Sequence, residues 1–197
     1  MNGEIYYQGH GSLRITTKDG YVIYIDPFAG DGYDKPADLI LVTHQHGDHN
    51  QINLPARKPE CRVWQNSDAL DNGKYNSADF GFVKVRATQA YNRNHHRDKC
   101  VGYILEFDSI KVYVAGDTSA TEQMETMADE KFDYAFLPTD GIFNMGPKEA
   151  SKCAELIGAK HTIPYHMKPS ALFSQRVADK FNAAGKLIIK NGESIEY

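Results

Sequence analysis

We base the predicted fold of this chain mainly on one stretch, Leu39-Ile40-Leu41-Val42-Thr43-His44-Gln45-His46-Gly47-Asp48-His49. Its first four residues form an apolar run that is typical of a buried β-strand. The six residues after Thr43 hold three imidazoles and one carboxylate, which are ligands for zinc, iron and manganese. On extended chain His44 and His46 point to the same side. A turn at Gly47 would therefore let the segment give one pair of ligands to each of two neighbouring metals.

The composition is that of an ordinary soluble protein. The chain has 197 residues, of which 41% are hydrophobic and 24% charged, so we expect a single domain over residues 1–197 with a sizeable core. The net charge of −4 argues against a nucleic-acid partner bound through its phosphates.

Cysteine spacing and hydropathy predict the compartment. Cys61, Cys100 and Cys153 are far apart and form no paired motif, so we expect free thiols in a reducing environment. The first residues carry no signal-peptide pattern, and no apolar run approaches the roughly 20 residues that cross a bilayer. We therefore expect a cytoplasmic protein with no membrane association.

Strand patterns dominate each half of the sequence, and helical patterns follow them. Alternation and β-branched runs predict strands at 4–8, 12–17, 21–25, 39–43, 61–65, 82–87, 101–107, 111–115, 134–138, 161–165, 187–190 and 194–197. Helical spacing and capping residues predict helices at 67–72, 121–128, 147–157 and 170–184. This pattern indicates a strand-rich α+β protein, and it fits a four-layer αββα sandwich with two mixed β-sheets flanked by helices.

Two further metal-ligand candidates follow predicted strands. Asp117 comes after the strand at 111–115, where Gly116 allows a sharp turn, and its carboxylate can bridge two cations. His166 follows the strand at 161–165. Because the ends of adjacent strands converge on one edge of a sheet, we expect both side chains to meet the histidine motif in space.

Several segments together match a known family pattern. They are His44–His49 as an HxHxDH motif, Gly116-Asp117-Thr118, Pro164-Tyr165-His166 and Ile25-Asp26-Pro27-Phe28. On these segments the chain resembles the metallo-β-lactamase-fold superfamily of metal-dependent hydrolases. Within it the chain is most similar to a small, lidless branch related to ascorbate-6-phosphate lactonase-like proteins, on Gly9-His10-Gly11-Ser12, Ala90-Tyr91-Asn92 and Gly102-Tyr103.

The resemblance implies a role for each matching residue. It assigns His44 and His46 to a first metal, Asp48, His49 and His166 to a second metal, and Asp117 to a bridge between them. Many members place a third histidine for the first metal in the mid-chain loop, where this sequence has Asn92. Asn92, His95 and His96 are therefore alternative ligands at that position. Asp26 is expected to orient a ligand histidine. The implied cofactor is zinc, as two ions, with manganese or iron as alternatives.

The hypothesis for the mechanism is metal-assisted hydrolysis. Water held between two cations loses its proton near neutral pH, and the hydroxide attacks a carbonyl or phosphorus. Asp48 is placed to orient the hydroxide and accept a proton. His10, or one of His95 and His96, is a candidate to protonate the leaving group, although His10 equally suits a structural turn.

The short chain favours a small-molecule substrate, either an ester, a lactone or a phosphoester, and a homo-oligomer stays open. Two rival functions stay open as well. One is a di-iron redox enzyme on the same scaffold, and the other is a non-catalytic metal-binding module. Outside the motif, His161 and Tyr165 are expected to be structural, and a turn role is favoured for Asp140 over a place at the rim of the site.

Overall fold

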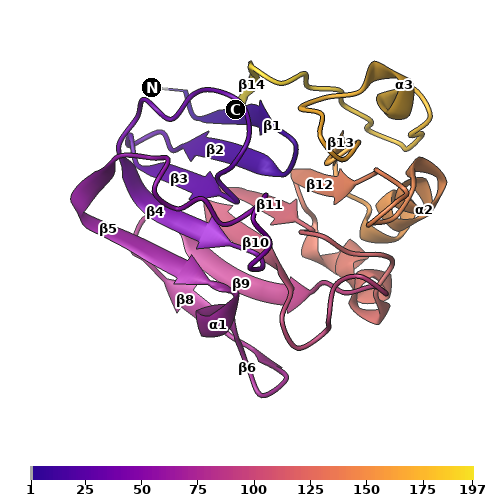
Figure 1. The fold of residues 1–197 in the computed structure, drawn as a ribbon, viewed down its shortest axis with the longest axis horizontal. Coiled ribbons are helices and arrows are strands. Elements are labelled where there is room, and N and C mark those ends of the chain that lie inside the picture. Colours follow the sequence, from indigo (N-terminus) through magenta and orange to yellow (C-terminus); the bar gives the residue numbers. More distant parts are fainter. Residues whose placement is uncertain (1) are drawn as a thin grey trace.

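Two six-stranded β-sheets form the centre of the protein, for which a computed structural model describes residues 2–197 (Figure 1). In spatial order, the first sheet contains β14 (Glu193–Glu196), β1 (Glu4–Gly9), β2 (Ser12–Thr16), β3 (Val22–Ile25), β4 (Ala37–Val42) and β5 (Arg57–Gln65). The second sheet contains β13 (His161–Tyr165), β12 (Tyr134–Pro138), β11 (Ile110–Val114), β10 (Val101–Phe107), β9 (Lys84–Gln89) and β8 (Ser77–Asp79).

The two sheets repeat one pairing scheme. β3, β4 and β5 pair in parallel, as do β11, β12 and β13, while every other neighbour in both sheets pairs antiparallel. Both sheets are therefore mixed, as predicted. Since parallel strands end on the same edge, each sheet presents three adjacent strand ends from which loops can carry side chains to one place.

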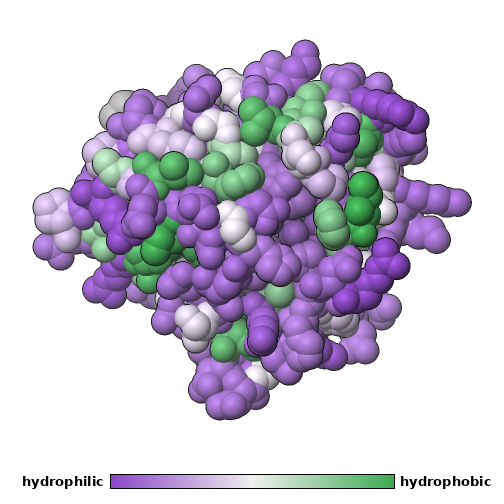
Figure 2. All heavy atoms as spheres, in the orientation of Figure 1, coloured by the Kyte–Doolittle hydropathy of each residue, from purple (hydrophilic) through white to green (hydrophobic). Residues whose placement is uncertain are grey.

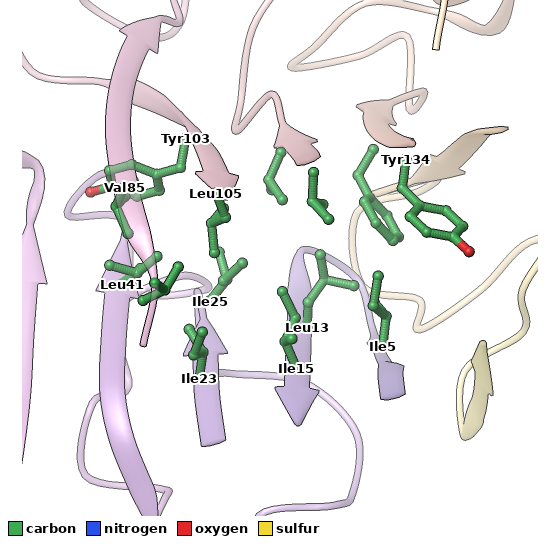
Figure 3. Packing of buried hydrophobic residues seen from close by; sticks show 14 of the residues in the cluster. Ile5, Leu13, Ile15, Ile23, Ile25, Leu41, Val85, Tyr103, Leu105 and Tyr134 are labelled. Atoms are coloured by element: carbon green, nitrogen blue, oxygen red, sulfur yellow. The ribbon is translucent and has the colours of Figure 1, made fainter. Parts of the chain in front are cut away.

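The main core lies between the two sheets (Figure 3). The inward-facing residues of the first sheet include Ile5, Leu13, Ile15, Ile23, Ile25 and Leu41, and those of the second include Val85, Tyr103, Leu105 and Tyr134. They come from alternate positions, as the pleat of a strand requires. The hydroxyl of buried Tyr103 donates a 2.7 Å hydrogen bond to the carbonyl of Val42, which joins β10 to the end of β4 across the core.

Helices cover the outer face of the second sheet. The 3₁₀ helix η1 (Glu122–Glu130) and α2 (Pro147–Ile157) form an apolar cluster with β11 and β12. As predicted, α2 has Pro147 in its first turn and ends at Gly158, whose φ of 63° suits a glycine cap. The outer face of the first sheet packs against loop residues that include Tyr33 and Ile52. This arrangement confirms the predicted α+β sandwich.

Shorter elements complete the chain. They are α1 (Asn66–Ala69), the small hairpin of β6 (Leu70–Asp71) and β7 (Lys74–Tyr75), and α3 (Gln175–Ala178). Between residues 2 and 197, no helix is long and apolar enough to cross a membrane.

The helix predicted at residues 170–184 is wrong, because only α3 forms there. The preceding segment is held in another conformation. The carbonyl of Leu172 accepts hydrogen bonds from the backbone N–H of His10 at 2.8 Å and the hydroxyl of Tyr7 at 3.1 Å. Ser170 also has a left-handed φ of 64°. Tertiary contacts with β1 and the turn after it therefore replace the first turns of the expected helix.

The strand predicted at residues 187–190 is also wrong. Residues 187–190 form no strand, and Lys186 makes an isolated bridge with Thr162. The final strand β14 pairs antiparallel with β1, with Ile195 opposite Ile5. The C-terminal segment thus adds to the edge of the first sheet instead of folding back on itself.

Candidate metal centre

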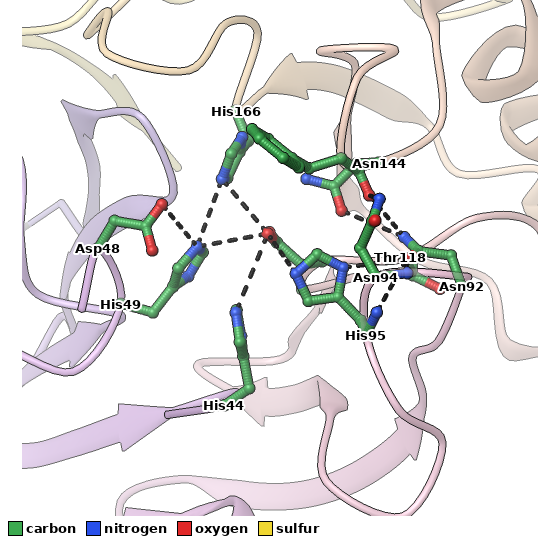
Figure 4. Close-up of polar contacts among 12 residues, drawn as sticks. His44, Asp48, His49, Asn92, Asn94, His95, Thr118, Asn144 and His166 are labelled. Carbon is green, nitrogen blue, oxygen red and sulfur yellow. Dashed lines mark hydrogen bonds and ion pairs between the residues drawn. The ribbon is translucent and has the colours of Figure 1, made fainter. Parts of the chain in front are cut away.

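Loops that follow strands of both sheets converge on one group of polar side chains (Figure 4). The histidine motif follows β4, and Asp26 follows β3. From the second sheet, Asp117 follows β11 and His166 follows β13, while His95 lies in the loop between β9 and β10. In Figure 4, His44, His49, His95 and His166 point toward a common centre.

The side chains form three overlapping groups of candidate metal ligands. Two of them share no residue: His44, His46 and His95 form one, and His10, Asp48, His49 and His166 form the other. The third contains Asp26, His44 and His49, and so shares one histidine with each of the first two. Within each group the ligand atoms lie within 4.8 Å of one another. The structure thus places His44 with His46 in one group and Asp48 with His49 in the other.

Asp117 lies between the two groups. Its Oδ2 is 3.2 Å from the Nε2 of His95 and 4.0 Å from the Nε2 of His44. The same oxygen is 3.5 Å from the Nε2 of His49 and 3.4 Å from the Nε2 of His166. The Asp117 carboxylate thus lies within 4.0 Å of imidazole nitrogens from both groups.

The donor set fits divalent cations. His44 Nε2 and Asp117 Oδ1 are buried and have no hydrogen-bond partner among the described residues. Leaving such atoms unpaired costs roughly 1–3 kcal/mol each, and a cation would satisfy both. Imidazole nitrogens with a few carboxylate oxygens suit zinc and also iron or manganese.

The three candidate ligands in the mid-chain loop, Asn92, His95 and His96, lie in different environments. His95 is buried within the first group, whereas the His96 side chain is 68% exposed and lies 3.6 Å from Asp98. Asn92 does not face Asp117, because its Oδ1 accepts hydrogen bonds from the backbone N–H of His95 and of Asn94. The structure therefore brings His95 into the cluster and leaves His96 outside it.

Asp26 contacts the motif from behind. Its Oδ2 lies 2.8 Å from His49 Nδ1, and its two oxygens accept hydrogen bonds from the N–H and the hydroxyl of Thr43. Because the Thr43 hydroxyl donates to Asp26, it is free to accept from His44 Nδ1 at 3.0 Å. Sequence analysis missed Thr43, although a hydroxyl directly before the first histidine was a usable signal.

Burial and mutual contacts shift the pKa values of the cluster. Burial, aided by the nearby His49, lowers the pKa of His44 to about 2, so this imidazole stays neutral. Burial opposes the charged form of His49, but Asp117 and Asp26 raise its pKa well above the usual range. Burial likewise opposes ionisation of Asp117, yet His166 and His49 hold its pKa well below the usual range. Asp117 is therefore an ionised carboxylate.

Buried His10 and half-exposed Asp48 contact each other at one side of the centre. His10 Nε2 lies 3.0 Å from Asp48 Oδ2, and this hydrogen bond holds the pKa of Asp48 well below its usual range. The His10 ring lies 3.8 Å from the His166 ring, centroid to centroid. His10 also lines a cavity of about 250 Å³ together with Phe28, Ala29, Ser170, Ala171 and Leu172.

Exposed hydrophobic residues border this region. The large apolar side chains of Phe28 and Leu172 are 43% and 39% exposed, although both line the cavity. Figure 2 shows that hydrophobic residues on the face viewed there form small separate groups within a mostly hydrophilic surface.

Asp140, for which the sequence favoured a turn role, has that role and also lies 3.2 Å from His166 Nδ1. His161 lies apart from the cluster, and its ring stacks on the ring of Tyr134. The hydroxyl oxygen of buried Tyr165 accepts a hydrogen bond from the backbone N–H of Gly116. These contacts give both residues a structural role.

Comparison with known proteins identifies the family. Residues 4–166 match the family described as a beta-lactamase superfamily domain. A UPF0173 metal-dependent hydrolase from Geobacillus sp. (strain WCH70) is 32% identical, with 98% of this chain and 99% of that protein covered. Another from Rubrobacter xylanophilus is 34% identical over 82% of this chain and 80% of that protein. A crystal structure described as a metal-dependent hydrolase, from Parabacteroides distasonis, superposes with a TM-score of 0.78 at 31% identity, covering 96% and 93% of the two chains.

The fold, the histidine and aspartate cluster and these relatives agree, and the chain belongs to the metallo-β-lactamase superfamily as a metal-dependent hydrolase.

Proposed function

We propose that this protein is a two-zinc hydrolase of small ester, lactone or phosphoester substrates, built as a single domain. The observation that carries the proposal is the position of Asp117 Oδ2 within 4.0 Å of imidazole nitrogens from both ligand groups. In this assignment His44, His46 and His95 would hold one ion, Asp48, His49 and His166 would hold the other, and Asp117 would serve both.

Zinc bound there would act as a Lewis acid and lower the pKa of water from about 16 to about 7. The chain supplies the acceptor for the proton. Asp48 is half-exposed and its Oδ2 lies 3.0 Å from His10 Nε2, so the carboxylate can receive the proton at the open side of the centre and pass it to His10. His10 is the candidate to hold that carboxylate in place and to return a proton to the leaving group.

The cavity beside His10 supports a small substrate with an apolar part. Its volume of about 250 Å³ lies just below the usual range of ligand sites, which begins at about 300 Å³. Phe28 and Leu172 give it apolar walls next to His10. Similarity to ascorbate-6-phosphate lactonase-like proteins favours lactones within this class. The three free thiols support a cytoplasmic location.

The experiment is metal analysis of purified protein combined with a substrate panel. We expect two zinc ions per chain and hydrolysis of at least one small ester, lactone or phosphodiester. Asp117→Ala should abolish turnover and lower metal content, whereas Asp98→Ala, an exposed carboxylate outside the cluster, should change neither. A visible di-iron spectrum without hydrolysis would establish the redox alternative, and bound zinc without any turnover would establish a non-catalytic module.

A further inference from the structure

A chain of polar contacts outside the metal cluster joins His95 to His166. His95 Nδ1 lies 3.1 Å from Asn92 Oδ1, and Asn92 Nδ2 lies 3.4 Å from Asn144 Oδ1. Asn144 Nδ2 donates to Asp140 Oδ2 at 3.0 Å, and the same oxygen lies 3.2 Å from His166 Nδ1. Figure 4 shows Asn92 and Asn144 between the two histidines. The two ends of this chain are candidate ligands of different ions.

The orientation of the Asn92 amide determines the tautomer of His95. Asn92 Oδ1 accepts the backbone N–H of Asn94 at 2.8 Å and of His95 at 3.0 Å. Asn92 Nδ2 donates to the carbonyl of Phe143 at 2.9 Å. A flipped amide would lose all three bonds, so the oxygen must face His95. His95 Nδ1 therefore carries the proton, and the lone pair of Nε2 is directed at the centre.

Asp140 determines the tautomer of His166 in the same way. Its Oδ1 accepts the backbone N–H groups of Ile142, Phe143 and Asn144 at 2.6, 2.9 and 3.0 Å, which fixes the carboxylate in its turn. Its Oδ2 makes a close polar contact with His166 Nδ1 that falls short of an aligned hydrogen bond. An ionised carboxylate only accepts, so the proton belongs on Nδ1 of His166. The Nε2 lone pair again faces Asp117.

We propose that Asn92, Asn144 and Asp140 are positioning residues that orient His95 and His166 together, so that binding of one zinc ion depends on the state of the other ligand group. This inference rests on the ligand assignment proposed above. It has a counterpart on the other side of the centre, where Asp26 and Thr43 connect His44 with His49. Each outer network thus spans both ligand groups.

The key variant is Asn144→Ala, which cuts the chain at its middle without touching either histidine. The matched control is Asn94→Ala. Asn94 donates to the same Phe143 carbonyl, but it belongs to neither the chain nor the cluster. Zinc affinity of the full-length protein is measured by competition with a chelator. We expect Asn144→Ala to lower affinity about 10–100-fold, whereas Asn94→Ala should stay within about twofold.

A second readout follows the imidazole protons directly. In zinc-loaded protein with ¹⁵N-labelled histidine, NMR should show protons on Nδ1 of both His95 and His166. In Asn144→Ala both signals should exchange faster with solvent, although the substitution contacts neither ring. Asn144→Asp, which keeps the shape and removes the donor to Asp140, should repeat the loss of affinity if the alanine variant folds poorly.

The positioning role is overturned if Asn144→Ala and Asn144→Asp bind zinc as tightly as Asn94→Ala, or if either histidine carries its proton on Nε2. Neither measurement uses a substrate. Absence of hydrolysis would therefore count against the proposed function alone, and unchanged affinity in the Asn144 variants would count against the positioning chain alone.

Discussion

The Nε2 of His95 lies 3.2 Å from the Oδ2 of Asp117. This contact ties a histidine from a polar loop to the carboxylate at the end of β11. The contact distinguishes His95 from its neighbour His96, because the sequence presents both as candidate ligands of the first metal.

His95→Ala should therefore lower zinc content or affinity and reduce turnover, because the group of His44 and His46 would lose its third nitrogen. His96→Ala removes an exposed imidazole from the same loop and should leave both properties unchanged. Metal analysis and steady-state kinetics of the two variants test this. Equal losses in both variants would show that the loop, and not the His95 ring, is what matters.

Asp26→Asn should weaken metal binding about 10–100-fold without removing a ligand. Its carboxylate orients His49 directly and His44 through Thr43. Thr43→Val breaks only the contact to His44, so its effect should be smaller. Chelator competition ranks the two variants, and a larger loss for Thr43→Val would contradict the shared role of Asp26.

Gly102→Ala should destabilise the fold, because no space exists for a side chain at this position of β10. An added Cβ would lie 2.6 Å from Thr88 Oγ1 and 2.7 Å from the carbonyl oxygen of Ala115. Overpacking of this kind typically costs about 1–3 kcal/mol, which corresponds to a Tm lower by roughly 2–4 °C per kcal/mol. Gly47→Ala, where nothing lies within 4 Å, is the control and should melt like the parent.

Glu130 links η1 to two strands of the second sheet, and its contribution should depend on pH. Its oxygens lie 2.9 Å from Lys111 Nζ and 2.7 Å from an Arg86 nitrogen. The hydrogen bond from Lys111, aided by Arg86, lowers the pKa of Glu130 although partial burial opposes this. A lowered folded-state pKa stabilises the protein above the unfolded pKa, and this stabilisation is lost as the pH falls through the folded-state pKa.

Glu130→Gln should therefore lower the Tm at pH 7 by roughly 1–3 °C, as expected for about 0.5–1 kcal/mol from a partly exposed ion pair. The difference from the parent protein should shrink as the pH falls toward 3. Glu122→Gln, an exposed residue at the start of the same helix, serves as the control. A deficit that is equally large at low pH would mean that packing, and not charge, explains the effect.

The sequence predicted the parts of the fold that depend on local patterns. The apolar run before His44 formed β4, and Pro147 with Gly158 bounded α2 as expected. The helix expected at 170–184 failed because the Leu172 carbonyl is bonded by Tyr7 and His10, which lie far away in the chain. No local pattern could show that competition.

Like the fold, the site was predictable where it depends on local sequence patterns. The spacing of the motif predicted two ligand groups, and strand ends predicted the approach of Asp117 and His166. The choice between His95 and His96 depends on the orientation of the loop, which the Asn92 amide fixes through hydrogen bonds. Asn144 gave no signal at all, because its importance comes only from where the turn at Asp140 places it.

The candidate centre draws its side chains from both sheets of the sandwich. A cation bound there would connect the loops of the first sheet to those of the second. Unfolding that separates the two sheets would have to release the cation. By mass action, a ligand present at 1,000 times its dissociation constant adds about 4 kcal/mol to the free energy of unfolding. Zinc supply would then govern the lifetime of the folded protein as well as its activity, and metal starvation would expose the chain to proteolysis.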